Sequence, residues 1–192
     1  MADTKISALT ASTTPLAGTE VLPIVQSGTT KQVSVANLTA GRVISANGVA
    51  FPATASASSD PNTLDDYEEG TWTPTPTGGT FGVTYASGFY TKVGRQVTAT
   101  CFLAWNSLSG SGNFSISLPF TINNTNYYRG AISLGNSSTL ILLAGYAIVG
   151  TLDQGATQTD FYFLQTNLSS QRMTVASLGS SGNITFTATY MV

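Results

Sequence analysis

Histidine, cysteine and charged side chains are scarce in this sequence of 192 residues. The absence of histidine removes the commonest general base and metal ligand of proteins. Cys101 is the single cysteine, which excludes an intrachain disulfide and a zinc cage, and we interpret it as a small buried residue of a strand. Charged residues make up 8% of the chain, against about 25% in ordinary soluble proteins. The surface must therefore consist mainly of Ser, Thr, Asn, Gln and Gly.

The charge pattern and the apolar runs exclude two classes of partner. The net charge is -2 and the seven basic residues are scattered singly, so we expect no binding to nucleic acid. The most apolar run, residues 140–149, is interrupted by Gly145 and is far shorter than the roughly 20 residues of a membrane helix. The first residues, MADTKIS, lack the apolar core of a secretory signal. We expect a chain made in the cytoplasm of its host, with no cofactor and no membrane segment.

Residues 71–192 are typical of an all-β domain. Few Lys, Glu and Arg residues are available for the outer faces of helices, whereas Thr, Tyr and Phe favour strands. Short strand-like runs alternate with turns, among them FGVTY and GFYTKV separated by Ala86 and Ser87, and a turn at Gly94 and Arg95. The pattern predicts about eight to nine strands in an antiparallel β-sandwich, jelly-roll-like in type.

Three of these runs show which side chains face the core. Alternate apolar residues predict one dry face for each strand. They are Val97, Ala99, Cys101, Leu103 and Trp105 in the first run, Phe114, Ile116 and Leu118 in the second, and Ile184, Phe186, Ala188, Tyr190 and Val192 in the last. The stretches SLSGSGN, from Ser107 to Asn113, and GSSGN, from Gly179 to Asn183, are predicted to be loops or hairpin turns.

The N-terminal segment, residues 1–41, has a different pattern. Short apolar groups alternate with polar turns, and VLPIVQ and KQVSV predict a hairpin with its loop at residues 27–30 and Pro23 at an edge. So few apolar side chains cannot form a core of their own. The segment either folds onto the rest of the chain or attaches to a partner. The residues expected to make such a contact are Ile6, Leu9, Val21, Leu22, Pro23, Ile24, Val25, Val33, Val35 and Leu38.

The order of motifs in residues 2–39 resembles a known family segment. ADTKISALT, then EVLPIVQ, then TTKQVSVANL is similar to the N-terminal segment of tailed-bacteriophage tail fibre, head fibre and other particle-surface proteins. In that family the segment is the part next to the virion. The resemblance therefore implies an arm that attaches to another virion protein, either the major capsid protein or a tail or adaptor protein.

Residues 42–70 are expected to form an extended linker. They are rich in Ala and Ser, contain Gly48, Pro52 and Pro61, and end in the acidic motif NTLDDYEEGTWTP. Neighbouring carboxylates can bind calcium, but the ligand spacing of a calcium loop is absent, so we expect no metal site. We interpret the motif as a solvated turn leading into the domain, with Trp72 covering an edge of the core.

The linker and the C-terminal domain carry a second resemblance. NGVAFPATASASSDPNTLDDYEEGTWTP resembles phage tail-fibre-like proteins, with Ser56 in place of a common glutamine. The succession EEGTWTP, GFYTKVGRQV, SGNFSISLPF and a final Thr-Tyr strand is similar to C-terminal domains of phage fibre and capsid decoration proteins. These are generally homotrimers, so the resemblance implies a homotrimer.

Nothing in the sequence predicts catalysis. A catalytic serine would have no histidine partner, and Asp153 and Asp160, the one carboxylate pair considered for glycoside hydrolysis, flank the expected solvated loop LDQGATQTD. Sugar binding without cleavage is a better hypothesis, because amide and aromatic groups suit neutral sugars. The candidate glycan contacts are Asn123, Asn124, Asn126, Tyr127, Tyr128 and Arg129, although a loop that leads into a strand accounts for the same residues.

Together, these observations predict a non-enzymatic structural protein on the surface of a bacteriophage virion. Residues 42–70 are too short and too aperiodic to form the long shaft of a tail fibre, which favours a capsid decoration, cement or head-fibre protein. The alternative is a short tail fibre or receptor-binding protein that recognises a glycan of the host surface.

Overall fold

The chain consists almost entirely of β-strands in the computed structural model. The structure describes residues 21–34, 43–45, 48–51, 54, 58–60, 62–125, 129–140, 146–165 and 169–192. These residues belong to two units, Met1–Pro52 and Ala53–Val192. All strand pairs are antiparallel, and the helical content of the described residues is one short 3-10 turn, η2 (Val175–Ser177). No helix among them is long and apolar enough to cross a membrane. The predicted antiparallel all-β fold is confirmed.

The first unit contains two small hairpins. β1 (Val21–Gln26) pairs with β2 (Thr29–Ser34) through a two-residue turn, tighter than the four-residue loop expected from the sequence. Ser27 and Gly28 both have positive φ angles, 52° and 73°, which a turn that follows the twist of two antiparallel strands requires. β3 (Val43–Ser45) pairs with β4 (Gly48–Ala50) within the stretch expected to be an extended linker.

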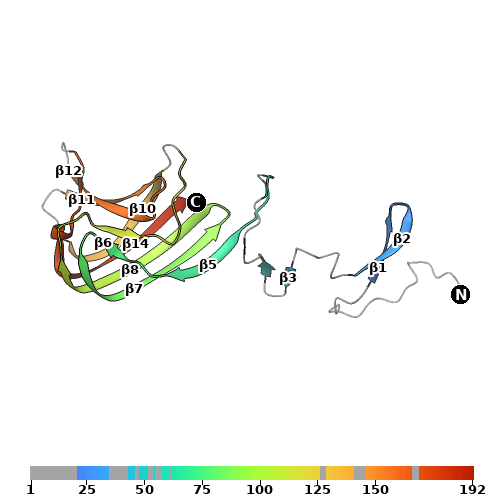
Figure 1. Cartoon of the computed structure of the whole chain (residues 1–192), viewed down its shortest axis with the longest axis horizontal. Coiled ribbons are helices and arrows are strands. Elements are labelled where there is room, and N and C mark those ends of the chain that lie inside the picture. Colours follow the sequence, from blue (N-terminus) through green and yellow to red (C-terminus); the bar gives the residue numbers. More distant parts are fainter. Residues whose placement is uncertain are drawn as a thin grey trace. The chain divides into compact units, whose positions relative to one another are not determined.

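The second unit contains one continuous path of paired strands (Figure 1). In sequence order the strands are β5 (Tyr67–Trp72), β6 (Pro76–Thr77), β7 (Thr80–Val93), β8 (Gln96–Ser109), β9 (Ser115–Ser117), β10 (Arg129–Leu140), β11 (Tyr146–Asp153), β12 (Gln158–Gln165), β13 (Gln171–Arg172) and β14 (Leu178–Met191). In space their order is β5-β7-β8-β14-β10-β11-β12-β9-β6, with β13 paired to β12. The last strand along the chain, β14, thus lies in the middle of the sheet.

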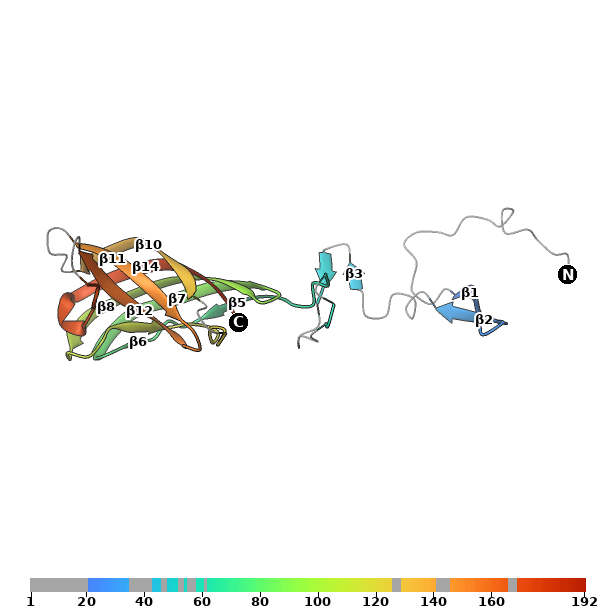
Figure 2. The same ribbon diagram turned by 90° about the horizontal axis from the view of Figure 1, so that it is seen from above.

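This path curls into two walls that face each other. We call β5, β7, β8, β14 and β10 the first wall, and β11, β12, β9 and β6 the second wall. The walls are joined where β10 meets β11, through only two residue pairs, Arg129 with Asp153 and Gly130 with Leu152. Seen from above, β11 and β12 cross obliquely over β7 and β8 (Figure 2).

A short segment also ties the two ends of the path together. β5 is one edge strand and β6 is the other, and residues 73–75 connect them. The backbone N–H of Thr75 donates to Ser117 Oγ at 2.9 Å, and the N–H of Ser117 donates to the Thr75 carbonyl at 3.0 Å. The motif EEGTWTPTP therefore begins on one edge of the curled sheet and ends on the other.

The core lies between the two walls and matches the predicted alternation. Each of the five alternate residues of β8 from Val97 to Trp105 is at most 2% exposed, and so is each of the four of β14 from Ile184 to Tyr190. Phe114 stacks on Phe161 at 5.2 Å between ring centroids, and Phe161 meets the edge of Phe186 at 5.9 Å. The aromatic side chains thus join β12 of the second wall to β14 of the first.

Several predicted strand boundaries are wrong. β7 continues through Ala86 and Ser87, and β8 extends to Ser109 into a stretch expected to be a loop. Residues 179–183, expected to form a hairpin turn, lie within β14. In each case the stretch is paired with a long neighbouring strand, whose hydrogen bonds outweigh the local preference of Gly and Ser for turns. The turn at Gly94 and Arg95 is confirmed.

Candidate functional site

The β1–β2 hairpin exposes a group of large apolar side chains. Val21, Leu22, Ile24 and Val25 are 50%, 44%, 36% and 75% exposed. Pro23 is exposed as well, and Val33 is half-buried. Because the apolar residues of β1 are consecutive, they lie on both faces of the hairpin. Four other residues predicted to contact the virion, Ile6, Leu9, Val35 and Leu38, lie outside the described residues.

The acidic motif is part of the fold of the second unit. Asp66 forms an ion pair with Lys92, and both side chains are only 13–14% exposed. The Lys92 ammonium also lies 5.8 Å from the centre of the Phe120 ring. Glu68 accepts a hydrogen bond from the Tyr90 hydroxyl at 2.5 Å, and this bond, together with burial, raises the pKa of Tyr90. These contacts fix β5 against β7.

The other carboxylates of the motif have partners within the same region. Asp65 accepts a hydrogen bond from the backbone N–H of Ser58 at 2.8 Å, and Glu69 accepts one from the hydroxyl of Tyr67. Among the residues that the structure describes, no group of three or more Asp, Glu or Cys residues could hold a metal ion. The motif therefore belongs to a strand and its flanks, where the sequence suggests a solvated turn.

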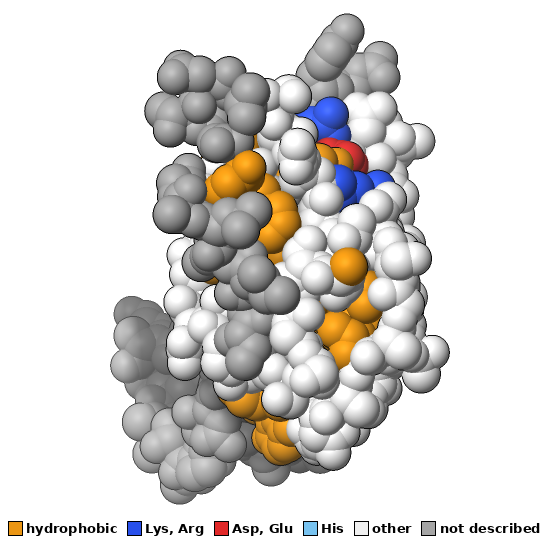
Figure 3. Space-filling model, turned by 90° about the vertical axis from the view of Figure 1, so that its left-hand side faces the viewer, with side chains coloured by type: hydrophobic (Ala, Val, Ile, Leu, Met, Phe, Trp, Pro, Cys, Tyr) orange, Lys and Arg blue, Asp and Glu red, His pale blue; other side chains and the backbone are white. Residues whose placement is uncertain are grey.

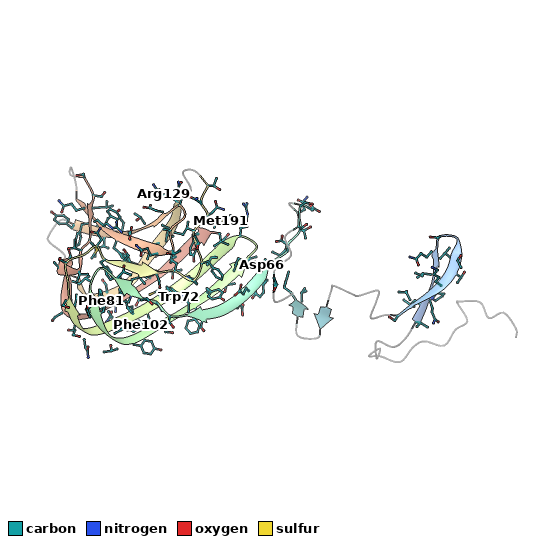
Figure 4. All side chains as sticks on the ribbon, in the orientation of Figure 1. Asp66, Trp72, Phe81, Phe102, Arg129 and Met191 are labelled. Atoms are coloured by element: carbon teal, nitrogen blue, oxygen red, sulfur yellow. The ribbon has the colours of Figure 1, made fainter. Side chains whose placement is uncertain are left out.

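A hollow of about 450 Å³ lies on the outer side of the second wall, beside its joint with β10. It is lined by Arg129, Gly130, Val149, Gly150, Thr151, Leu152, Asp153, Tyr162, Leu164 and Ser170. Arg129 and Asp153 form an exposed ion pair at its lip, with 62% and 47% of their side chains exposed, and Figure 4 labels Arg129 at this position. Tyr162 pairs with Val149 across β11 and β12 and provides an aromatic surface. The hollow thus combines a ring, a hydroxyl, a guanidinium and a carboxylate.

The backbone at the joint is packed too closely for side chains. A Cβ atom on Gly150 would lie 2.4 Å from Ile132 Cδ1, and one on Gly130 would lie 2.6 Å from Leu152 Cδ1. Both glycines are therefore required for β10 to approach β11. This close approach fixes the position of Arg129 and Asp153 at the lip.

The predicted glycan contacts divide into four groups. Arg129 lines the hollow, whereas Asn126, Tyr127 and Tyr128 lie outside the described residues. Asn123 is used within the fold: its backbone N–H donates to the Met191 carbonyl at 2.8 Å and its Oδ1 accepts from the N–H of Thr125 at 2.8 Å. Asn124 is exposed.

Sequence reasoning did not identify Tyr162 and Thr151 as lining residues. The available signal for Tyr162 is its position in DFYFL, between two phenylalanines of which Phe161 is fully buried and Phe163 packs against the core. In a strand, a residue between two inward side chains faces outward.

The two aspartates that the sequence offers for glycoside hydrolysis each have a different arginine partner. Asp153 pairs with Arg129 and Asp160 pairs with Arg172 at 2.5 Å. Asp160 also accepts a hydrogen bond from Ser115 Oγ at 2.5 Å and its side chain is only 15% exposed. Asp153 ends β11 and Asp160 lies in β12, so the two carboxylates flank the mostly exposed turn between these strands, as expected. That the chain has no enzymatic activity stays a prediction.

Cys101 and Tyr190 are buried, and burial governs their acidity. Cys101 is 2% exposed, and burial raises the pKa of its thiol to about 12. Burial also raises the pKa of Tyr190 to about 12, against a smaller opposite effect of the hydrogen bond that the Phe120 backbone N–H donates to its hydroxyl oxygen. Both groups are neutral at physiological pH, so Cys101 has no thiolate available for nucleophilic chemistry.

The surface of the second unit carries few charges. Figure 3 shows mainly uncharged polar surface on one end of the unit, with a small group of basic and acidic side chains near one corner and separate hydrophobic patches. This agrees with the low charged fraction of the sequence. Such a surface is more suited to contacts with neutral groups than to electrostatic recognition.

Comparison with known proteins identifies a similar fold. No protein-family model matches this chain, and no curated protein matches its sequence. The crystal structure of the Dettilon tailspike protein is similar, with a TM-score of 0.56 and 17% sequence identity. The match covers 65% of this chain and 24% of the tailspike chain, so the matched part corresponds to about a quarter of that protein. At this identity the similarity concerns the fold.

Proposed function

We propose that this chain is a non-enzymatic structural protein of a bacteriophage virion, attached to the particle by its N-terminal arm. The curled β-sheet would be displayed on the virion surface as a homotrimer. The similarity of this sheet to part of a tailspike supports a phage surface protein. The observation that carries the attachment is the β1–β2 hairpin, whose apolar side chains are exposed on both faces.

The hairpin has the composition of a segment that is completed by a partner. Burying an apolar side chain that is half exposed contributes about 1 kcal/mol, so the four exposed side chains of β1 would contribute several kcal/mol to docking. The partner would be the major capsid protein or a tail or adaptor protein. Within this class we favour a capsid decoration, cement or head-fibre protein, because residues 42–70 are too short to form a shaft.

Removal of the arm tests the attachment. We expect a chain that lacks residues 1–41 to keep its folded β-sheet and to be lost from purified particles. A finer test replaces Leu22 and Val25 with serine, with Lys31→Ser, also exposed on the hairpin, as the matched control. Particle association should fall for the first variant and persist for the control. Full association of the truncated chain would refute the attachment.

The number of copies on the particle distinguishes capsid decoration from a tail fibre. Quantitative mass spectrometry of purified virions should give copy numbers in proportion to the major capsid protein if the chain decorates the capsid. A few copies per particle, located at the tail by electron microscopy, would contradict decoration and support the alternative.

The alternative function is a short tail fibre or receptor-binding protein that recognises a host glycan. The hollow of the second wall favours it, because a tyrosine ring and a paired arginine and aspartate can stack on a sugar and bind its hydroxyl groups. Tyr162→Ala should abolish binding to isolated host surface glycan, whereas Leu64→Ala, which changes an exposed side chain before β5, should not. Equal binding by both variants would exclude the hollow as the receptor site.

A further inference from the structure

The outer side of the first wall presents a continuous row of threonine and aromatic side chains across four strands. Directly opposite residues of antiparallel strands face the same way, so the register defines this side. Phe89 is opposite Thr100, which is opposite Thr187, and Ser87 is opposite Phe102, which is opposite Thr185. These residues alternate with the buried residues of β8 and β14, so they point away from the core.

The aromatic side chains on this side are far more exposed than those of the core. Phe89 is 61% exposed, Tyr85 58% and Phe102 39%, and the rings of Tyr85 and Phe102 meet edge to face at 5.5 Å. Figure 4 shows the labelled Phe102 on the outer side of β7 and β8. We call the following residues the aromatic face: Tyr67, Thr71, Tyr85, Phe89, Thr91, Val93, Thr98, Thr100, Phe102, Thr185, Thr187 and Thr189.

Charge is nearly absent from this surface. Among the described residues on the outer side of β5, β7, β8 and β14, Glu69 is the one that carries a formal charge, and it lies on the edge strand β5. Its carboxylate accepts the hydrogen bond from the Tyr67 hydroxyl. A face without charges offers nothing to a partner of complementary charge. It does allow two identical copies to meet without placing like charges opposite each other.

The size of the aromatic face is suited to a protein partner. From Tyr85 to Val93 the face is about 30 Å long, and four strands make it about 20 Å wide. Its plan area is thus about 600 Å², close to the roughly 800 Å² per partner of a standard interface and above that of most crystal-packing contacts.

Two shallow hollows lie beside the Phe89 ring. One, of about 310 Å³, is lined on this face by Tyr85, Ser87, Thr100, Phe102 and Thr185 together with Phe89. The other, of about 450 Å³, is lined by residues of β5 and β7 that include Thr71 and Thr91. A protruding ring between hollows gives the face both a convex and a concave part, and in a ring of copies the convex part of one face can meet a concave part of the next.

We propose that the aromatic face is the surface through which copies of this chain contact one another. The inference rests on the homotrimer of the proposed function and assigns its interface to the outer side of the first wall. Phe89 and Phe102 are its central contacts. The outer side of the second wall, which carries the hollow at Arg129, remains outside the interface and accessible.

The mass of the full-length chain in solution tests this inference. We expect light scattering coupled to size exclusion to show a trimer for the wild type. The variant Phe89→Ser with Phe102→Ser should raise the dissociation constant at least about 100-fold and run as a monomer at the same concentration. The matched control is Leu164→Ser, which changes a 41% exposed leucine of the second wall and should remain trimeric.

A second variant separates loss of association from loss of folding. Thr100→Arg places a charge in the middle of the aromatic face at an exposed position and removes no core contact. It should be monomeric with the circular dichroism spectrum of the wild type. Trimers formed by both variants would overturn the inference and leave the homotrimer intact. A monomeric wild type would overturn both, whereas a wild-type dimer dissociated by the variants would support the interface and refute the trimer.

Discussion

The contact between Trp72 and Gly88 makes a sharp test of how β5 is held in the sheet. These residues are directly opposite in β5 and β7, and a Cβ atom built on Gly88 would lie 2.2 Å from Trp72 Nε1. Gly88→Ala must therefore displace the indole ring, at a cost of about 1–3 kcal/mol typical of overpacking. Without the ring, alanine in a strand should be about 0.5–1 kcal/mol better than glycine.

The expected result is a change of sign between two backgrounds. In the wild type, Gly88→Ala should lower the free energy of unfolding by about 1–2 kcal/mol. In the Trp72→Ala background, which itself costs about 2 kcal/mol because the ring is partly buried against the core, the same change should be neutral or stabilising by about 0.5 kcal/mol. The coupling energy of the cycle is then about 2 kcal/mol.

A third substitution refines the role of the ring. In the described structure, Trp72 Nε1 is buried without a hydrogen-bond partner, which carries a cost of about 1–3 kcal/mol. Phenylalanine keeps a ring at this position and removes the unpaired N–H. The destabilisation caused by Trp72→Phe should therefore be smaller than the loss of ring size alone predicts. Urea denaturation followed by circular dichroism, at one fixed protein concentration, measures all four variants. Equal destabilisation by Gly88→Ala in both backgrounds would refute the assigned contact.

Two further predictions concern acidity and ion pairs. Because the pKa of the Cys101 thiol is raised from 9.0 to about 12 in the folded chain, its contribution to stability is complete below pH 9 and is lost as the pH rises from 9 to 12. The free energy of unfolding of Cys101→Ala, measured from pH 8 to 11, should therefore fall less steeply than that of the wild type, and parallel curves would contradict this. Asp66→Asn breaks the buried pair with Lys92 and should lower the free energy of unfolding, measured by urea denaturation, by about 3 kcal/mol. Asp153→Asn breaks the exposed pair with Arg129 and should lower it by less than about 1 kcal/mol. Equal losses for the two variants would show that burial does not distinguish the two pairs.

The sequence predicted the core well because two long strands alternate without interruption. Val97 to Trp105 and Ile184 to Tyr190 follow a period of two, and each inward side chain of these two runs is buried, whereas Val192 at the end of the second run is partly buried. The order of the strands was not predictable in the same way. The pairing of β8 with β14 joins residues far apart in sequence, and such pairing depends on the whole set of strands competing for the same edge.

The acidic motif shows why local composition did not predict strand β5. Tyr67–Trp72 carries two glutamates and Gly70, which is a poor composition for a strand. The strand forms because Tyr90 and Lys92 of β7 supply a hydrogen bond to Glu68 and an ion pair to Asp66. These partners are more than twenty residues away, so a local pattern cannot show them.

The candidate functional surfaces were only partly predictable. Arg129 was identified through its polar neighbours, whereas Phe102 was overlooked although it stands among threonines on the polar side of its strand. An aromatic residue on the outward phase of a strand is a signal that sequence reasoning can use. The hollow of the second wall, by contrast, depends on the joint between β10 and β11, which only the three-dimensional structure reveals.

The central place of β14 has a consequence for the order of events during synthesis. β14 lies between β8 and β10, yet it is the last strand of the sheet to leave the ribosome. Before β14 is made, β8 is paired with only one of its two long neighbours, β7. The apolar side chains of the second wall then have no complete first wall to pack against. The β5–β7–β8 meander can form early, but the core closes only after translation of this region ends. Each nascent chain thus exposes the central edge of its sheet for the whole time that separates β8 from β14, and identical chains made nearby compete for that edge before β14 occupies it.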